Sequence, residues 1–143
     1  MERWGVHEFK YAVSLRFFSK TFDLDDVCSQ LNLSPKWLNK IGEPRINPKG
    51  TPLGGVYDCS YCSVILEPHE AEELHETLER VAVGLMQYKD LFQAIRRDGG
   101  RAEFFIGWYS TGNTGDTFDS GLLKKLGELE IDLAFDVYGE SAG

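Results

Sequence analysis

The sequence predicts an α+β fold in which a four-stranded, mainly antiparallel sheet carries helices on one face. Two observations favour it. Strand-like and helix-like segments follow one another along the chain, and the first and last strand segments each have one strongly apolar face and one mixed face. We expect a two-layer sandwich that is a variant of the ferredoxin-like arrangement. The length of 143 residues predicts a single domain over 1–143, with loose ends at 1–8 and 139–143.

A strand followed by a short helix opens the chain. Every second residue from Phe9 to Phe17 is apolar, which is the period of a half-buried strand, and the strand is expected to end soon after. Asp23 is suited to cap a helix that runs to about Leu31. Cys28 falls on the apolar stripe of this helix and is predicted to be a small buried residue.

Later segments complete the sheet and the helical layer. The apolar pattern predicts, in order, a strand over 56–66, helices over 68–82 and 87–97, a strand over 102–110, a helix from 119 or 120 to 129, and a strand over 131–138. Gly84 marks the break between the two central helices, with one continuous helix or a dimeric coiled coil as alternatives. If the first and last strands are neighbours, Lys10 and Arg16 can pair with Asp132 and Asp136 on the open face, while Phe135 faces the core.

Composition narrows the classes of partner and compartment. The net charge is −8 and the pI about 4.8, so the surface repels phosphate backbones and we expect no nucleic-acid partner. The first eight residues lack the apolar core of a signal peptide, and no apolar run is long enough to cross a membrane. The chain has three cysteines, an odd number, and their spacing is not that of a disulfide-rich domain. This argues against a secreted domain held together by disulfides. A cytoplasmic protein is therefore expected.

The stretch 32–57 is rich in Pro and Gly and is predicted to be one long loop. It carries four cations against the single acid Glu43, which reverses the sign of the chain's charge. Trp37 beside Lys36 and Lys40 combines a stacking surface with positive charge. We therefore predict that the part of this loop over 34–50 binds a ligand or partner through Lys36, Trp37, Lys40, Arg45 and Lys49. The alternative is that Trp37 folds back as a lid over the core and the cations are only solvated.

Cys59 and Cys62 have the spacing of half a zinc site or of a redox pair. A zinc site needs two more ligands, and the sequence has no second pair with this spacing. In an extended strand the two side chains point to opposite faces, which prevents chelation. We favour ordinary strand cysteines, keep a metal or redox site at Cys59 and Cys62 as the alternative, and expect no cofactor.

Two other segments resemble functional motifs without matching them. The segment 69–75 looks like a metalloprotease helix, but Glu73 stands where the motif needs its second His. We interpret it as a solvated acidic helix face. The Gly-rich segment 110–117 precedes a helix, yet Asp116 and Asp119 would compete with a bound phosphate there, so an ordinary loop is expected.

Several short motifs together resemble an uncharacterised bacterial family, domain of unknown function 4279, over residues 13–138. The motifs are Val13-Ser14-Leu15, Asp23-Leu24-Asp25, Leu31-Asn32-Leu33-Ser34-Pro35, Lys40-Ile41-Gly42-Glu43, the Leu74/Leu78 helix, Ile131-Asp132-Leu133 and Asp136-Val137-Tyr138. The family usually has Trp near the start of its second strand, where this chain has Tyr57 after a proline-rich insert. The resemblance supports the α/β fold and implies no activity.

The expected function is that of a non-enzymatic protein-interaction module, a monomer or homodimer with a protein partner. Toxin-neutralising immunity proteins, which also act by binding another protein, are an analogy for this kind of function. The alternative is a small-ligand binding or regulatory domain whose basic loop 34–50 closes over an anionic ligand. An enzyme is not expected, because an active site needs converging titratable groups in a cleft and the sequence indicates none.

Overall fold

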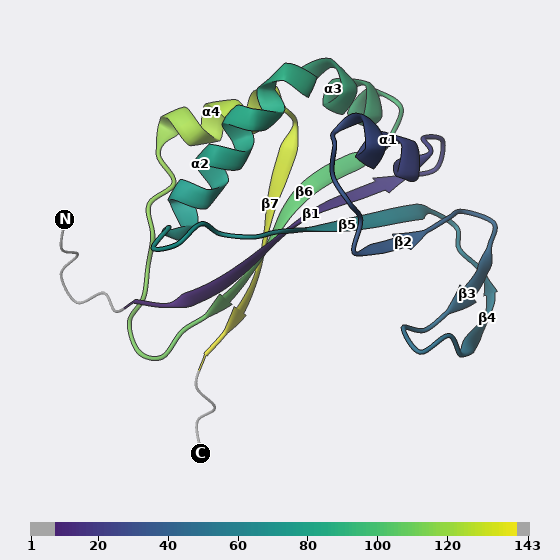
Figure 1. Cartoon of the computed structure of the whole chain (residues 1–143), viewed down its shortest axis with the longest axis horizontal. Helices are drawn as coiled ribbons and strands as arrows, with labels where there is room; N and C mark the ends of the chain where they lie inside the picture. The colour runs from purple at the N-terminus through teal and green to yellow at the C-terminus, as the bar shows by residue number, and fades with distance from the viewer. Residues whose placement is uncertain (1–7, 140–143) are drawn as a thin grey trace.

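A five-stranded mixed sheet carries all the helices on one face in the computed structural model, which describes residues 8–139 (Figure 1). Its strands in spatial order are β2 (Trp37–Asn39), β5 (Ser60–Leu66), β1 (Lys10–Ser19), β6 (Arg101–Tyr109) and β7 (Ile131–Tyr138). The helices are α1 (Leu24–Gln30), α2 (Leu74–Leu85), the 3₁₀ turn η1 (Met86–Tyr88), α3 (Lys89–Arg97) and α4 (Ser120–Glu128). A hairpin of β3 (Pro44–Ile46) and β4 (Pro52–Val56) projects away from the helices.

The α+β class, the one-sided helical layer and the mainly antiparallel pairing are confirmed, but the predicted number of four strands is wrong. The stretch 32–57, predicted to be a loop, contains β2, β3 and β4. Each has only three to five residues, too short for a period-two pattern to appear in the sequence. The ferredoxin-like arrangement stays a prediction. Of the loose ends predicted at 1–8 and 139–143, residues 1–7 and 140–143 lie outside the described part of the chain.

The first and last strands are not neighbours, because β6 lies between them. β1 pairs with β6 antiparallel, whereas β6 pairs with β7 in parallel through the crossover helix α4. The predicted pairs of Lys10 and Arg16 with Asp132 and Asp136 are therefore wrong. Phe135, predicted to face the core, is 42% exposed, because the last part of β7 extends beyond the helical layer (Figure 1).

The core forms between β1 and the helices, as the period of β1 predicts. Val13, Leu15 and Phe17 are each at most 2% exposed. The Phe17 ring lies 5.6 Å from that of Phe92 in α3, which joins the central strand to the helical layer. Asp23 caps α1 as predicted, since its Oδ1 accepts hydrogen bonds from the backbone N–H groups of Asp25 and Asp26 at 3.0 and 3.3 Å.

Two predicted boundaries differ from the structure. The helix expected from residue 68 begins at Leu74, because Glu73 and Glu76 form a reciprocal capping box there. The predicted strand over 56–66 is split, with its first residue in β4, residues 57–59 in the connection, and residues 60–66 in β5. The predicted break between the central helices is confirmed and falls at η1, just after Gly84. Within residues 8–139, no helix has the length and apolar character needed to span a membrane.

Candidate functional site

The candidate site is the open face, which we define as the side of the five-stranded sheet that faces away from the helices. The register places Trp37 of β2 opposite Ser63 of β5, Ser63 opposite Arg16 of β1, and Arg16 opposite Glu103 of β6. Directly opposed residues point to the same side of a sheet. Trp37, Arg16 and Glu103 therefore form one row across the open face.

Arg16 occupies the middle of this row and is held by aromatic rings. Its guanidinium carbon lies 4.1 Å from the ring centre of Phe105, 5.5 Å from that of Tyr61 and 6.0 Å from that of Phe18. Its Nε donates a hydrogen bond of 3.1 Å to the Tyr61 hydroxyl. Within residues 8–139, neither Nη group donates to a partner. The side chain is thus fixed in place while its Nη groups keep donors that an acceptor from another molecule can use.

A second arginine on the same face is already neutralised. The Arg101 guanidinium lies 3.9 Å from the Phe18 ring centre, and its Nη1 donates to Glu103 Oε1 at 3.2 Å. Glu103 is only 6% exposed. This pair satisfies the buried carboxylate, so of the two arginines Arg16 is the one that stays available.

The structure divides the predicted site residues between two neighbouring places. Trp37 lies on the open face and does not fold over the core, since Leu38 beside it is the residue that packs there. Lys36 and Lys40 flank β2, while Arg45 lies in β3 and Lys49 at the tip of the hairpin. All four cationic side chains are exposed, and none forms an ion pair with another described residue.

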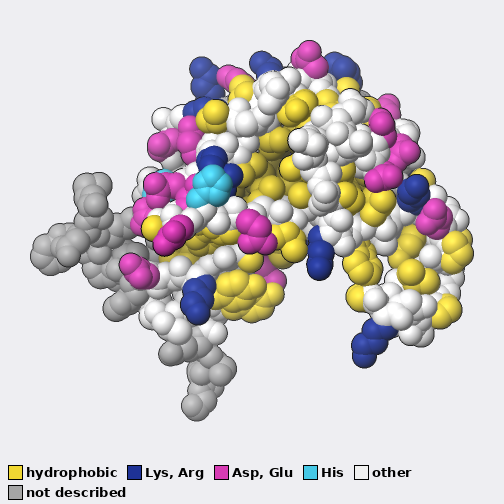
Figure 2. Space-filling model, viewed as in Figure 1, with side chains coloured by type: hydrophobic (Ala, Val, Ile, Leu, Met, Phe, Trp, Pro, Cys, Tyr) yellow, Lys and Arg dark blue, Asp and Glu magenta, His cyan; other side chains and the backbone are white. Residues whose placement is uncertain are grey.

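The hairpin, residues 44–56, adds an apolar surface to these cations. Ile46, Leu53 and Val56 are 44%, 51% and 56% exposed, and Ile41 before the hairpin is 43% exposed. Figure 2 shows hydrophobic side chains over much of the hairpin and an open hollow between it and the body of the molecule. The Tyr57 hydroxyl joins the base of the hairpin to the end of β3 next to the turn, through hydrogen bonds with the backbone N–H and C=O of Ile46, at 3.2 and 3.0 Å.

The cysteines predicted as the alternative site are separated by their environments. Cys62 is fully buried against Cys28 of α1, with their Sγ atoms 3.0 Å apart. Cys59 precedes β5, is half-buried, and donates instead to the backbone oxygens of Ser19 and Ser60. The burial predicted for Cys28 is confirmed at 1% exposure.

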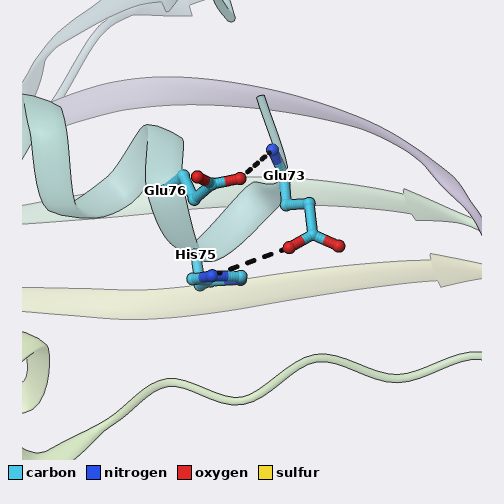
Figure 3. Close-up of side chains that lie close together, drawn as sticks. All are labelled: Glu73, His75 and Glu76. Carbon is cyan, nitrogen blue, oxygen red and sulfur yellow. Dashed lines mark hydrogen bonds and ion pairs between the residues drawn. The ribbon is translucent and has the colours of Figure 1, made fainter. Parts of the chain in front are cut away.

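A second cluster lies at the start of α2, where Glu73, His75 and Glu76 bring one potential ligand atom each within 4.8 Å of one another (Figure 3). His75 Nε2 lies 3.7 Å from Glu73 Oε2, and its Nδ1 lies 2.8 Å from the buried carboxylate of Asp116. The capping box already engages both glutamates. Helix capping explains their positions, and we assign no metal to them.

Glu72 lies beside this cluster and anchors a buried polar network. Its carboxylate accepts from Arg80 Nε at 2.8 Å and from the Thr77 hydroxyl at 2.6 Å. The Arg80 guanidinium, with help from Thr77, lowers the pKa of Glu72 to about 2, and burial raises the pKa of Tyr11, whose hydroxyl bonds to Thr77. Of these groups, Glu72 and Arg80 also line a groove of about 380 Å³ between α2 and α4. The network joins β1 to the helical layer and is mainly structural.

The lowered pKa of Glu72 predicts a specific acid sensitivity. Its ionised form is favoured in the folded state, so the stabilisation is complete above the ordinary value of 4.5 and is lost as pH falls toward about 2. We expect urea unfolding of Glu72→Gln to show a weaker dependence on pH across this window than the wild type. The exposed neighbour Glu70 is the matched control, because Glu70→Gln should leave the slope unchanged. Equal slopes in all three proteins would contradict the assignment.

Sequence reasoning placed Arg16 on the open face but could not supply its surroundings. Tyr61, Phe105 and Phe18 come from three strands, and only the register shows that they meet. The turn of the hairpin had a sequence signal, because Asn47 and Gly50 frame it. Asn47 Oδ1 accepts from two backbone amides, and Gly50 adopts a φ of 84°.

The comparisons with known proteins give a family and no activity. The family model described as Domain of unknown function (DUF4279) matches residues 7–140, nearly the whole chain. Neither the curated proteins nor the solved structures contain a match to the chain. The resemblance deduced from the sequence is confirmed, and the chain belongs to the DUF4279 family.

Proposed function

We propose that the protein is a non-enzymatic, cytoplasmic binding module that holds an acidic segment of a partner protein between its open face and the hairpin. The observation that carries this proposal is Arg16, whose guanidinium is ordered by three aromatic rings while its Nη donors have no acceptor within residues 8–139. A pre-ordered arginine loses little entropy on binding and can hold a carboxylate through two parallel hydrogen bonds.

Charge complementarity favours an acidic partner. The chain carries a net charge of −8, yet the segment of β2 and the hairpin carries Lys36, Lys40, Arg45 and Lys49 against the acid Glu43. A local reversal of sign of this kind steers an acidic partner to the surface and repels basic ones.

The apolar residues of the hairpin favour a protein over a small molecule. Exposed apolar side chains gathered among cations are typical of protein contact surfaces. An isolated two-stranded hairpin is marginally stable in water, so contact with a partner would also stabilise it. In the view of Figure 2 the hollow beside the hairpin is open, whereas small-ligand sites are usually enclosed.

The second candidate is a small anionic ligand bound by the same cations. The exposure of Lys36 and Lys40 at both ends of β2 favours it, because these side chains could converge on one anion if the hairpin moved inward. Native mass spectrometry of gently purified protein distinguishes the two. An additional small mass that denaturation removes, and that Lys40→Ala loses, would support this candidate over a protein partner.

Photo-crosslinking in the source cells tests the leading proposal. A photoreactive amino acid at Ser63, between Trp37 and Arg16, should give a covalent adduct with one partner protein, and Ser14 offers a second position on the same face. The control position is Lys124, an exposed residue of α4 on the helical layer. Adducts that form at Ser63 and vanish with Arg16→Ala support the open face. Adducts only at Lys124, or equally at both positions, would refute it.

A further inference from the structure

Two thiols meet in the core between α1 and β5. The Sγ atoms of Cys28 and Cys62 are 3.0 Å apart, and the residues are 1% and 0% exposed. Non-bonded carbon atoms rest about 3.5–4.0 Å apart, and sulfur is larger than carbon, so this pair is closer than ordinary packing requires. We infer that Cys28 and Cys62 are a redox-modification site that a small disulfide oxidant converts reversibly to an intramolecular disulfide.

The geometry favours this product. A disulfide has an S–S length of about 2.05 Å, so the two sulfurs need to approach by only about 1 Å. Cys28 belongs to the seven-residue helix α1, and a short surface helix can shift or open more readily than a central strand. Cys62 is fixed in β5, paired with both β1 and β2. The approach therefore requires a small movement of α1 and no change in the sheet.

The disulfide forms by two steps of thiol–disulfide exchange with oxidised glutathione. When α1 opens, the Cys28 thiolate attacks one glutathione sulfur, forms a mixed disulfide and releases one reduced glutathione. The Cys62 sulfur then attacks Cys28 Sγ and releases the second. The two cysteine thiols lose two protons and two electrons, which the glutathione disulfide gains. Cys28 is the first nucleophile because it moves outward with α1, whereas Cys62 stays fixed in β5.

The bond would constrain a segment that bears part of the proposed binding surface. The two cysteines are 34 positions apart, and the segment between them contains β2 and the whole hairpin. A crosslink across this segment reduces the freedom of the unfolded chain and raises stability. The inference does not rest on the proposed function, because it follows from the thiol pair alone.

The experiment uses the full chain carrying Cys59→Ser, which removes the half-buried third thiol. The protein is brought to equilibrium in glutathione redox buffers from two starting points, the folded reduced form and the unfolded reduced form. Intact mass spectrometry should show the loss of two hydrogens, and a peptide map should join Cys28 to Cys62. We expect the melting temperature to rise by about 5–15 °C, with dithiothreitol reversing both changes.

Two single-thiol variants provide the control. Cys28→Ala and Cys62→Ala, each with Cys59→Ser, should show no loss of two hydrogens and at most one glutathione adduct. Free thiols or separate glutathione adducts on both cysteines, from either starting point, would overturn the inference. A linked form that melts below the reduced form would overturn it too.

Discussion

Phe17→Ala should lower the free energy of unfolding by about 3–5 kcal/mol, the largest effect that we expect from a single substitution. The Phe17 side chain is completely buried in the central strand β1 and contacts Phe92 of α3. Its removal leaves a cavity where the sheet meets the helical layer, and paired strands on both sides prevent β1 from collapsing into it. Urea denaturation followed by circular dichroism measures the loss.

The adjacent residue provides a matched control of the same type. Phe18 points to the open face, where it contacts Tyr61 at 5.1 Å between ring centres and lies under Arg101. Phe18→Ala should lower the free energy of unfolding by only about 1 kcal/mol, through the lost ring contacts. Equal losses from the two substitutions would mean that the assignment of the two faces of β1 is wrong.

Gly100→Ala should lower the free energy of unfolding by about 2–3 kcal/mol. A Cβ at this position would lie 2.7 Å from the backbone oxygen of Phe18 and 2.9 Å from Ile95 Cγ2. The first of these neighbours belongs to the central strand and cannot move without shifting β1 itself. The end of α3 would have to separate from the sheet. Thermal unfolding monitored by circular dichroism should show the decrease.

Gly127 in α4 is the control for this substitution, because an added Cβ there meets nothing within 4 Å. Gly127→Ala should leave stability unchanged or raise it slightly, since Ala has the higher helix propensity. A similar loss from both variants would show that close approach is not the cause at Gly100.

Elements that depend only on nearby residues were predicted correctly from the sequence. The period of β1 placed Phe17 in the core and Arg16 on the open face, and the caps at Asp23 and Asp119 are both present. The sequence pattern predicted a helix start at 68, but the capping box around Glu73 is the stronger signal and positions α2. The sequence contained both signals, and only the structure shows which one prevails.

The sequence alone did not predict which strands pair when they are far apart along the chain. The neighbour of β1 could have been β6 or β7, and the crossover through α4 decided it. The site depends on the same information, because Arg16 meets Phe105 and Tyr61 only through the register of three strands. Trp37 reaches the open face because the three-residue strand β2 pairs with the edge of β5. A strand that short gives no pattern of its own.

We propose that the open face binds an acidic protein segment through Arg16. The most direct measurement is the affinity of the crosslinked partner for wild type, Arg16→Ala and Lys124→Ala, by isothermal titration calorimetry at one salt concentration. Both variants remove one positive charge, but only Arg16 lies on the open face. We predict that Arg16→Ala weakens binding at least about tenfold, with Lys124→Ala close to wild type. Equal affinities in all three proteins, at unchanged stability, would contradict the account.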